Sequence, residues 1–84
     1  MTPEQFALLS NRVTFYQDAI RQRVSEAKEA YQTSKITDIP EYAAIQRTKA
    51  IKALKAVVLH KRELEQAKKN LVEALMADLH KRKI

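Results

Sequence analysis

Residues 32–41, Gln-Thr-Ser-Lys-Ile-Thr-Asp-Ile-Pro-Glu, interrupt a helical pattern that otherwise runs the length of the chain. Pro40 disfavours helix at the residue before it, and Asp38 lies three residues before Glu41, which is the spacing of a capping box. Because no other segment resembles a loop, the sequence predicts one connection, at about residues 34–39. A single short connection favours two antiparallel helices.

The segment before this loop begins with a strong helix start signal. Thr2 suits the N-cap, Pro3 suits the first helical position, and Gln5 has the spacing of a capping box. The apolar residues that follow recur at helical spacing: Phe6, Leu9, Val13, Tyr16, Ile20, Val24, Ala27 and Tyr31. Their mean step from Leu9 onward is about 3.67 residues, which favours a nearly straight or slightly right-handed stripe. We expect this helix to cover about residues 3–33.

The segment after the loop has no internal helix breaker and predicts a second helix over about residues 40–82. Its apolar stripe is expected to contain Ala50, Leu54, Val57, Leu64, Ala67, Leu71, Leu75 and Leu79. If the chain folds back around Ile36, residue n of the first helix faces about residue 73−n of the second. Tyr16 then faces Val57, and residues from Val72 onward overhang the first helix.

Composition supports an all-α fold, an antiparallel hairpin of two long helices. The 84 residues include no glycine, which β-hairpin turns and phosphate-binding loops commonly require, and they are rich in strong helix formers. The absence of cysteine excludes disulfides and thiolate metal sites and is consistent with a cytoplasmic protein. No signal peptide or membrane-spanning run is evident, so membrane binding is not expected.

The sequence offers no arrangement of residues that is typical of a catalytic site. The two histidines, His60 and His80, have no His, Asp, Glu or Cys four residues away, so no helical metal pair exists at that spacing. The serines lack the glycines of a nucleophile elbow. We therefore expect no enzymatic activity, no cofactor, no metal and no small-molecule substrate.

Charge is unevenly distributed, because residues 1–41 carry a net charge of −1 and residues 42–84 a net charge of +7. On a helical wheel, a basic ridge falls away from the apolar stripe; it consists of Lys49, Lys52, Lys55 and Arg62. Such a ridge can follow the phosphates of a nucleic acid or bind an acidic protein. No aromatic residue is interleaved with it, so base stacking is not predicted. The alternative interpretation is a solvated charged face.

A second set of apolar residues indicates self-association. In the first helix, Leu8, Phe15 and Ala19 lie on a face about 120° from the main stripe. The predicted overhang adds Val72, Leu75, Met76 and Leu79. A two-helix hairpin buries only one seam, so we expect a dimeric four-helix bundle or coiled coil, with the overhang of one copy on the Leu8 and Phe15 surface of the other.

Three alternatives remain open for these apolar residues. They can be scattered exposed groups of the ordinary kind. The overhang can dock a different protein. The chain also resembles the small hairpin subunits of secretion needles in its size and in its proline-containing loop, which would imply a filament subunit.

Overall fold

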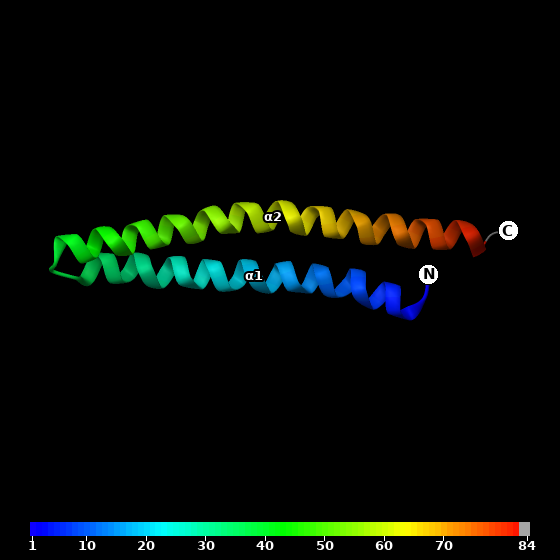
Figure 1. The fold of residues 1–84 in the computed structure, drawn as a ribbon, viewed down its shortest axis with the longest axis horizontal. Helices are drawn as coiled ribbons and strands as arrows, with labels where there is room; N and C mark the ends of the chain where they lie inside the picture. Colours follow the sequence, from blue (N-terminus) through cyan, green and yellow to red (C-terminus); the bar gives the residue numbers. More distant parts are fainter. Residues whose placement is uncertain (83–84) are drawn as a thin grey trace.

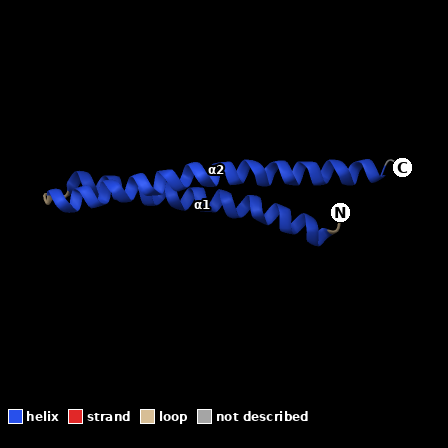
Figure 2. Ribbon diagram, turned by 45° about the horizontal axis from the view of Figure 1, so that its top comes forward, coloured by secondary structure: helices blue, strands red, loops and turns tan. Residues whose placement is uncertain are grey.

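The computed structural model describes residues 1–82 and consists of two helices, α1 (Pro3–Ile36) and α2 (Pro40–Arg82). They lie antiparallel and form a rod of 69 × 17 × 11 Å (Figure 1). No strand occurs within residues 1–82 (Figure 2). The predicted all-α hairpin of two long helices is thereby confirmed.

The start of α1 has the predicted capping box. The backbone N–H of Gln5 donates to the Thr2 hydroxyl at 3.2 Å, and the Thr2 N–H donates to the Gln5 side-chain carbonyl at 3.0 Å. Pro3 occupies the first turn, where a backbone N–H has no partner within the helix. Glu4 adds a negative charge beside the positive end of the helix dipole.

The end of α1 lies three residues beyond the predicted one, because the polar residues near it join the helix. The Thr33 hydroxyl donates to the Glu29 carbonyl at 2.9 Å, and the Ser34 hydroxyl donates to the Tyr31 carbonyl at 2.6 Å. Hydroxyls that bond to the preceding turn are compatible with a helix. Ser34 is also buried against the second helix, so this polar segment belongs to the packed seam rather than to a loop.

The connection is therefore only residues 37–39. The first backbone hydrogen bond of α2 runs from the Ala43 N–H to the Ile39 carbonyl at 3.0 Å. Ile39, and not Asp38, is thus the N-cap of α2, which differs from the capping box expected at Asp38 and Glu41. Pro40 takes the first helical position, to which its fixed backbone angle is suited.

The helices pack along a seam in which steps of three and four residues alternate. In α1 the seam contains Leu9, Val13, Tyr16, Ile20, Ala27, Ala30 and Ser34. In α2 it contains Ala43, Gln46, Ala50, Ala53, Val57, His60, Leu64, Ala67, Leu71, Ala74 and Asp78. This is the heptad spacing of a coiled coil, so the expected eleven-residue spacing was wrong.

At several seam positions a small residue is buried, whereas the sequence pattern predicted that a large neighbouring residue would be buried there. Ala53 is buried, whereas its neighbour Leu54 is 51% exposed. Ala30 is buried, whereas its neighbour Tyr31 is 50% exposed. Two helices joined by three residues approach closely, and only short side chains fit between their backbones. The predicted stripe members Val24, Leu75 and Leu79 are exposed because they lie beside the seam rather than within it.

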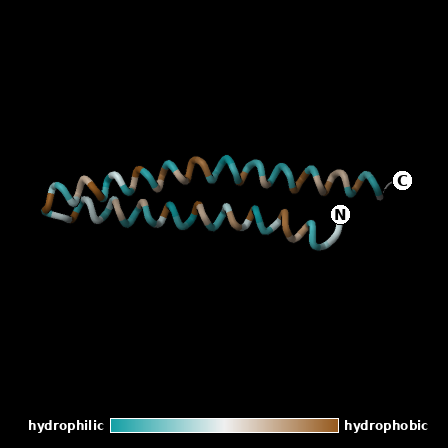
Figure 3. The backbone as a smooth tube through the Cα atoms, viewed as in Figure 1, coloured by the Kyte–Doolittle hydropathy of each residue, from teal (hydrophilic) through white to brown (hydrophobic). Residues whose placement is uncertain are grey.

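The core is consequently made of small side chains, while large ones lie outside. Among the residues that the structure describes, six of the eight buried hydrophobic ones are alanines, and the others are Val57 and Leu64. Seventeen large hydrophobic side chains of the same part of the chain are exposed instead. Figure 3 shows that apolar residues recur along both helices and are not confined to one segment.

The register at Tyr16 differs from the predicted one by three residues, because Tyr16 lies beside His60 rather than Val57. The rings of Tyr16 and His60 lie 6.4 Å apart between centroids, and the Met1 amino group forms an ion pair with Asp78. The turn is centred on Asp38 rather than Ile36. When the centre of a hairpin moves by one residue along the chain, the residue that faces a given position of the first helix moves by two. The start of α1 therefore reaches Asp78, and the predicted overhang from Val72 is reduced to the last turn.

Candidate interaction surfaces

The hairpin has two flanks, one on each side of the seam, and shallow hollows define them. One hollow is lined by Phe15, Ala19 and Gln22 of α1 together with His60 of α2. We call this side the Phe15 flank. The other hollow is lined by Gln17 and Ile20 of α1 together with Lys61, Leu64 and Glu65 of α2. We call that side the Glu65 flank.

Two apolar clusters of α2 lie on the Glu65 flank. Residues seven apart share a helix face, so Leu54 and Leu75 align with Lys61. By the same rule, Ile51, Val58, Val72 and Leu79 align with Glu65. All six side chains are 42–58% exposed. The flank thus has one apolar cluster before Lys61 and a second after Lys68, with charged residues between them.

The predicted self-association residues are divided between different faces. Leu8, Phe15 and Ala19 lie on the Phe15 flank, where Phe15 is 64% exposed and contacts Tyr16 edge to face at 5.4 Å. The structure places Val72, Leu75 and Leu79 on the Glu65 flank and Met76 on neither, because Met76 aligns with Arg62 and Lys69 on the outer face.

This division affects how two copies could meet. If the C-terminal part of α2 packed on the Leu8 and Phe15 surface of a second copy, each copy would use two opposite flanks. Such a contact is heterologous, and it does not close into a symmetric dimer through one interface. The single surface that we expected from the sequence is therefore two surfaces.

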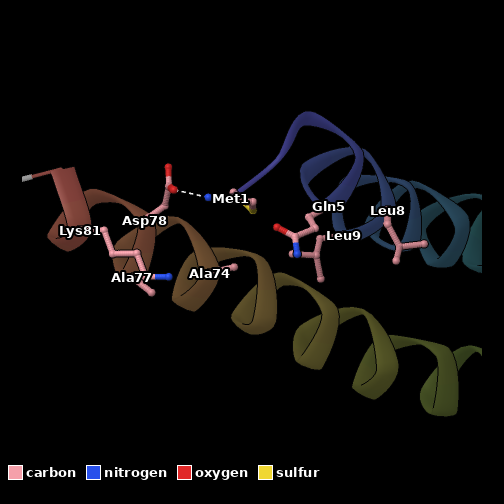
Figure 4. A pocket seen from close by; sticks show the side chains of 8 residues that line it. All are labelled: Met1, Gln5, Leu8, Leu9, Ala74, Ala77, Asp78 and Lys81. Carbon is pink, nitrogen blue, oxygen red and sulfur yellow. Dashed lines mark hydrogen bonds and ion pairs between the residues drawn. The ribbon is translucent and has the colours of Figure 1, made fainter.

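A hollow of about 370 Å³ lies between the free ends of the helices (Figure 4). It is lined by Met1, Gln5, Leu8 and Leu9 from the start of the chain and by Ala74, Ala77, Asp78 and Lys81 from α2. The ion pair between Met1 and Asp78 spans its outer end. The hollow exists because α1 diverges from α2 toward its N-terminus (Figure 2).

Part of the basic ridge lies on the outer face of α2, namely Lys55 and Arg62. Lys49 and Lys52 lie closer to the seam, because each directly precedes a buried alanine. Arg62 is two residues from both His60 and Leu64 of the seam, which places it about 200° around the helix from each. Lys49, Lys52, Lys55 and Arg62 are all exposed, and none forms an ion pair with another described residue. Their charges are therefore available to an anionic partner.

A polar cluster interrupts the middle of the seam. The Tyr16 hydroxyl donates a hydrogen bond to Glu63, and this bond together with the negative charge of Glu63 raises the pKa of Tyr16 above its ordinary value. His60 Nδ1 lies 3.3 Å from Glu63 Oε1. Arg12 acts in the opposite direction on the pKa of Tyr16 but does not outweigh Glu63. The cluster links α1 to α2 near the middle of the seam.

Within the described residues, no three His, Cys, Asp or Glu side chains come together in a way that could hold a metal ion. Neither helix, over the part of the chain that the structure describes, has a stretch long and apolar enough to cross a membrane.

Comparisons with protein-family models, with curated proteins and with solved structures found no match for this chain. The function of this chain is therefore inferred from its own surfaces. The apolar positions of the Glu65 flank were readable in the sequence, because they follow a second heptad pattern parallel to the seam. Val72, Leu75 and Leu79 were predicted as self-association residues of the overhang, but Leu54 was assigned to the seam, so the continuous line along the flank was not recognised.

Proposed function

We propose that this protein is a non-enzymatic helical interaction module that self-associates, with two hairpins forming a dimeric four-helix bundle. The observation that carries this proposal is the distribution of side-chain size: within residues 1–82, most buried hydrophobic residues are alanines, whereas seventeen large hydrophobic side chains are exposed. In a hairpin arranged in this way, the large apolar side chains remain exposed and are available for burial against a partner.

Energetics supports the same proposal. Ordering a chain opposes folding by about 1.5 kcal/mol per residue, and full burial of one Leu, Val or Ile contributes about 1.5–3 kcal/mol. Alanine contributes much less, and only Val57 and Leu64 are larger buried hydrophobic residues. Packing against a second copy would bury the exposed side chains and supply the missing stabilisation.

Sedimentation equilibrium at micromolar concentration tests the proposal. We expect a mass of at least twice the 9.7 kDa of one chain. A 9.7 kDa monomer that unfolds cooperatively would contradict it, because such a hairpin would be stable without further burial.

A second candidate function is binding to the phosphate backbone of nucleic acid, or to an acidic protein, through the basic ridge. It is favoured by the four exposed cations, Lys49, Lys52, Lys55 and Arg62, that no acidic side chain within the described residues neutralises. The two functions are compatible, because a dimer would display two ridges.

The ridge is tested by titrating a DNA duplex at several salt concentrations. Binding through phosphates should weaken steeply with salt, and the Lys52→Glu, Lys55→Glu variant should lose binding while keeping its helical circular dichroism spectrum. A variant of Lys28 and Lys35, which lie on α1, provides a control with the same change in charge. Equal binding by the parent and the ridge variant would reject this function.

A further inference from the structure

We infer that the dimer forms through the Glu65 flank, with α2 of one copy antiparallel to α2 of the other and the two-fold axis midway between Glu65 and Lys68. This inference rests on the proposed self-association and specifies the surface and the direction of pairing. The partner is a second copy of this chain.

The first argument is the pattern along α2. Steps of three and four residues alternate through nine positions of the Glu65 flank: Ile51, Leu54, Val58, Lys61, Glu65, Lys68, Val72, Leu75 and Leu79. This is a second complete heptad seam, and it extends over about 42 Å of helix at 1.5 Å per residue. The first three and last three positions are apolar, and the middle three are charged.

The second argument is the symmetry of this pattern about its centre. Leu54 and Leu79 lie equally far on either side of the midpoint between Glu65 and Lys68, and so do Val58 and Leu75. A two-fold axis at this midpoint therefore lays the first apolar cluster of each copy on the second cluster of the other. Both clusters are covered in both copies through one closed interface, as an isologous dimer requires.

The third argument is charge, which separates antiparallel from parallel pairing. In parallel pairing each charged residue would meet its own copy, so two glutamates and two pairs of lysines would face each other. In antiparallel pairing the two kinds of heptad position alternate across the interface, so Glu65 shares a layer with a lysine of the partner subunit. Opposite charges then meet, and like charges across an interface are unfavourable.

The side chains at the centre are free to make such contacts. Within its own helix, Glu65 Oε1 lies 3.7 Å from Lys68 Nζ, and the Glu65 side chain is 76% exposed. A carboxylate this exposed has lone pairs left for a second cation. Lys61 also lies on the exposed surface of this flank.

The Phe15 flank does not offer a comparable surface. Its apolar line contains Leu8 and Phe15, but the next positions at intervals of seven are Gln22 and Glu29. The line therefore ends after two residues, whereas the apolar positions on the Glu65 flank of α2 span 51–79. A second copy would bury more apolar side chains on the Glu65 flank.

Disulfide cross-linking tests the surface and the direction together, since the natural chain has no cysteine. We expect the Leu54→Cys and Leu79→Cys variants to cross-link when mixed and not to cross-link separately. In the antiparallel dimer, two copies of the same position lie about 38 Å apart, because 25 residues of helix separate residues 54 and 79. Phe15→Cys, on the opposite flank, is the control and should remain uncross-linked.

Other outcomes separate this inference from the proposed function. Efficient cross-linking of Leu79→Cys with itself would show parallel pairing and overturn the antiparallel arrangement. A dimer by sedimentation in which Phe15→Cys cross-links, while the Leu54→Cys and Leu79→Cys mixture does not, would overturn the Glu65 flank and leave self-association standing. A monomeric natural chain would reject both.

A charge exchange provides an independent test. Glu65→Lys places lysines together near the axis and should weaken dimerisation roughly tenfold, whereas adding Lys61→Glu and Lys68→Glu to it should restore the affinity. Glu73→Lys changes the net charge equally on the exposed surface outside this flank and should have little effect. If Glu65→Lys dimerises as well as Glu73→Lys, the central contact of this inference is wrong.

Discussion

The two ends of the hairpin differ in how they are closed. Near the connection, Ala27, Ala30 and Ser34 of α1 are buried against α2, where alanines alternate with larger residues turned outward. Toward the free ends, Leu9 and Val13 are larger and yet only half-buried, and a hollow opens beside Ala74. The size of a seam residue therefore does not determine how deeply its side chain is buried in this molecule. Close approach of the helices determines burial, and the short connection imposes that approach at one end only.

The largest expected effect comes from the largest buried hydrophobic side chain. Leu64→Ala should lower the free energy of unfolding by about 2–5 kcal/mol, because it removes buried methyl groups and leaves a cavity. Leu59→Ala is the matched control, since Leu59 is exposed on the outer part of α2, and it should change stability by less than about 0.5 kcal/mol. Urea unfolding measures both. Equal losses would mean that Leu64 is not a core residue.

A smaller effect should distinguish the two ends directly. Ala30→Leu forces extra methyl groups into the closed end and should lower the free energy of unfolding by about 1–3 kcal/mol. Ala74→Leu adds the same atoms beside the hollow at the open end, where there is room for them, so it should be neutral or stabilising. Thermal unfolding of the two variants measures the contrast. Equal destabilisation would show that the open end is packed as tightly as the closed one.

The smallest effect concerns the polar cluster at the boundary between the ends. The bond from Tyr16 to Glu63 requires a protonated tyrosine, and the pKa of Tyr16 is raised in the folded chain. Its stabilisation is therefore fully present below the ordinary tyrosine pKa and is lost as pH rises through the raised value. Tyr16→Phe should consequently show a shallower loss of stability above about pH 10 than the parent.

Urea unfolding between pH 7 and 11 measures this difference. Tyr42→Phe controls for the removal of a tyrosine hydroxyl, because Tyr42 is exposed near the start of α2. If Tyr16→Phe has the same alkaline dependence as the parent, the bond to Glu63 does not contribute to folding stability.

Local signals in the sequence were sufficient for the helix boundaries where they involve proline and capping. Thr2, Pro3 and Gln5 predict the start of α1 correctly, and Pro40 predicts the start of α2. The end of α1 was predicted too early, because the hydroxyls of Thr33 and Ser34 suit a loop as well as a helix. Their bonds to the preceding turn depend on the packing of Ser34 against α2, which is not a local property.

The seam was harder to predict, because it depends on the distance between the helices. Hydrophobicity favours Leu54 over Ala53 and Tyr31 over Ala30, and the structure reverses both choices. No property of a single helix reveals how closely a second helix approaches. The basic ridge was predictable in part, because Lys55 and Arg62 lie about 200° around α2 from the seam and their exposure is insensitive to small changes in its position.

The concentration dependence of thermal unfolding tests the central claim most directly, namely that the large exposed residues are buried between two copies. Circular dichroism would follow unfolding from about 1 to 100 μM chain, since folding that is coupled to association shifts with concentration. We predict that the midpoint rises steadily over this range. A midpoint that stays constant while the unfolding remains cooperative would show that the hairpin is stable alone, and it would contradict the account.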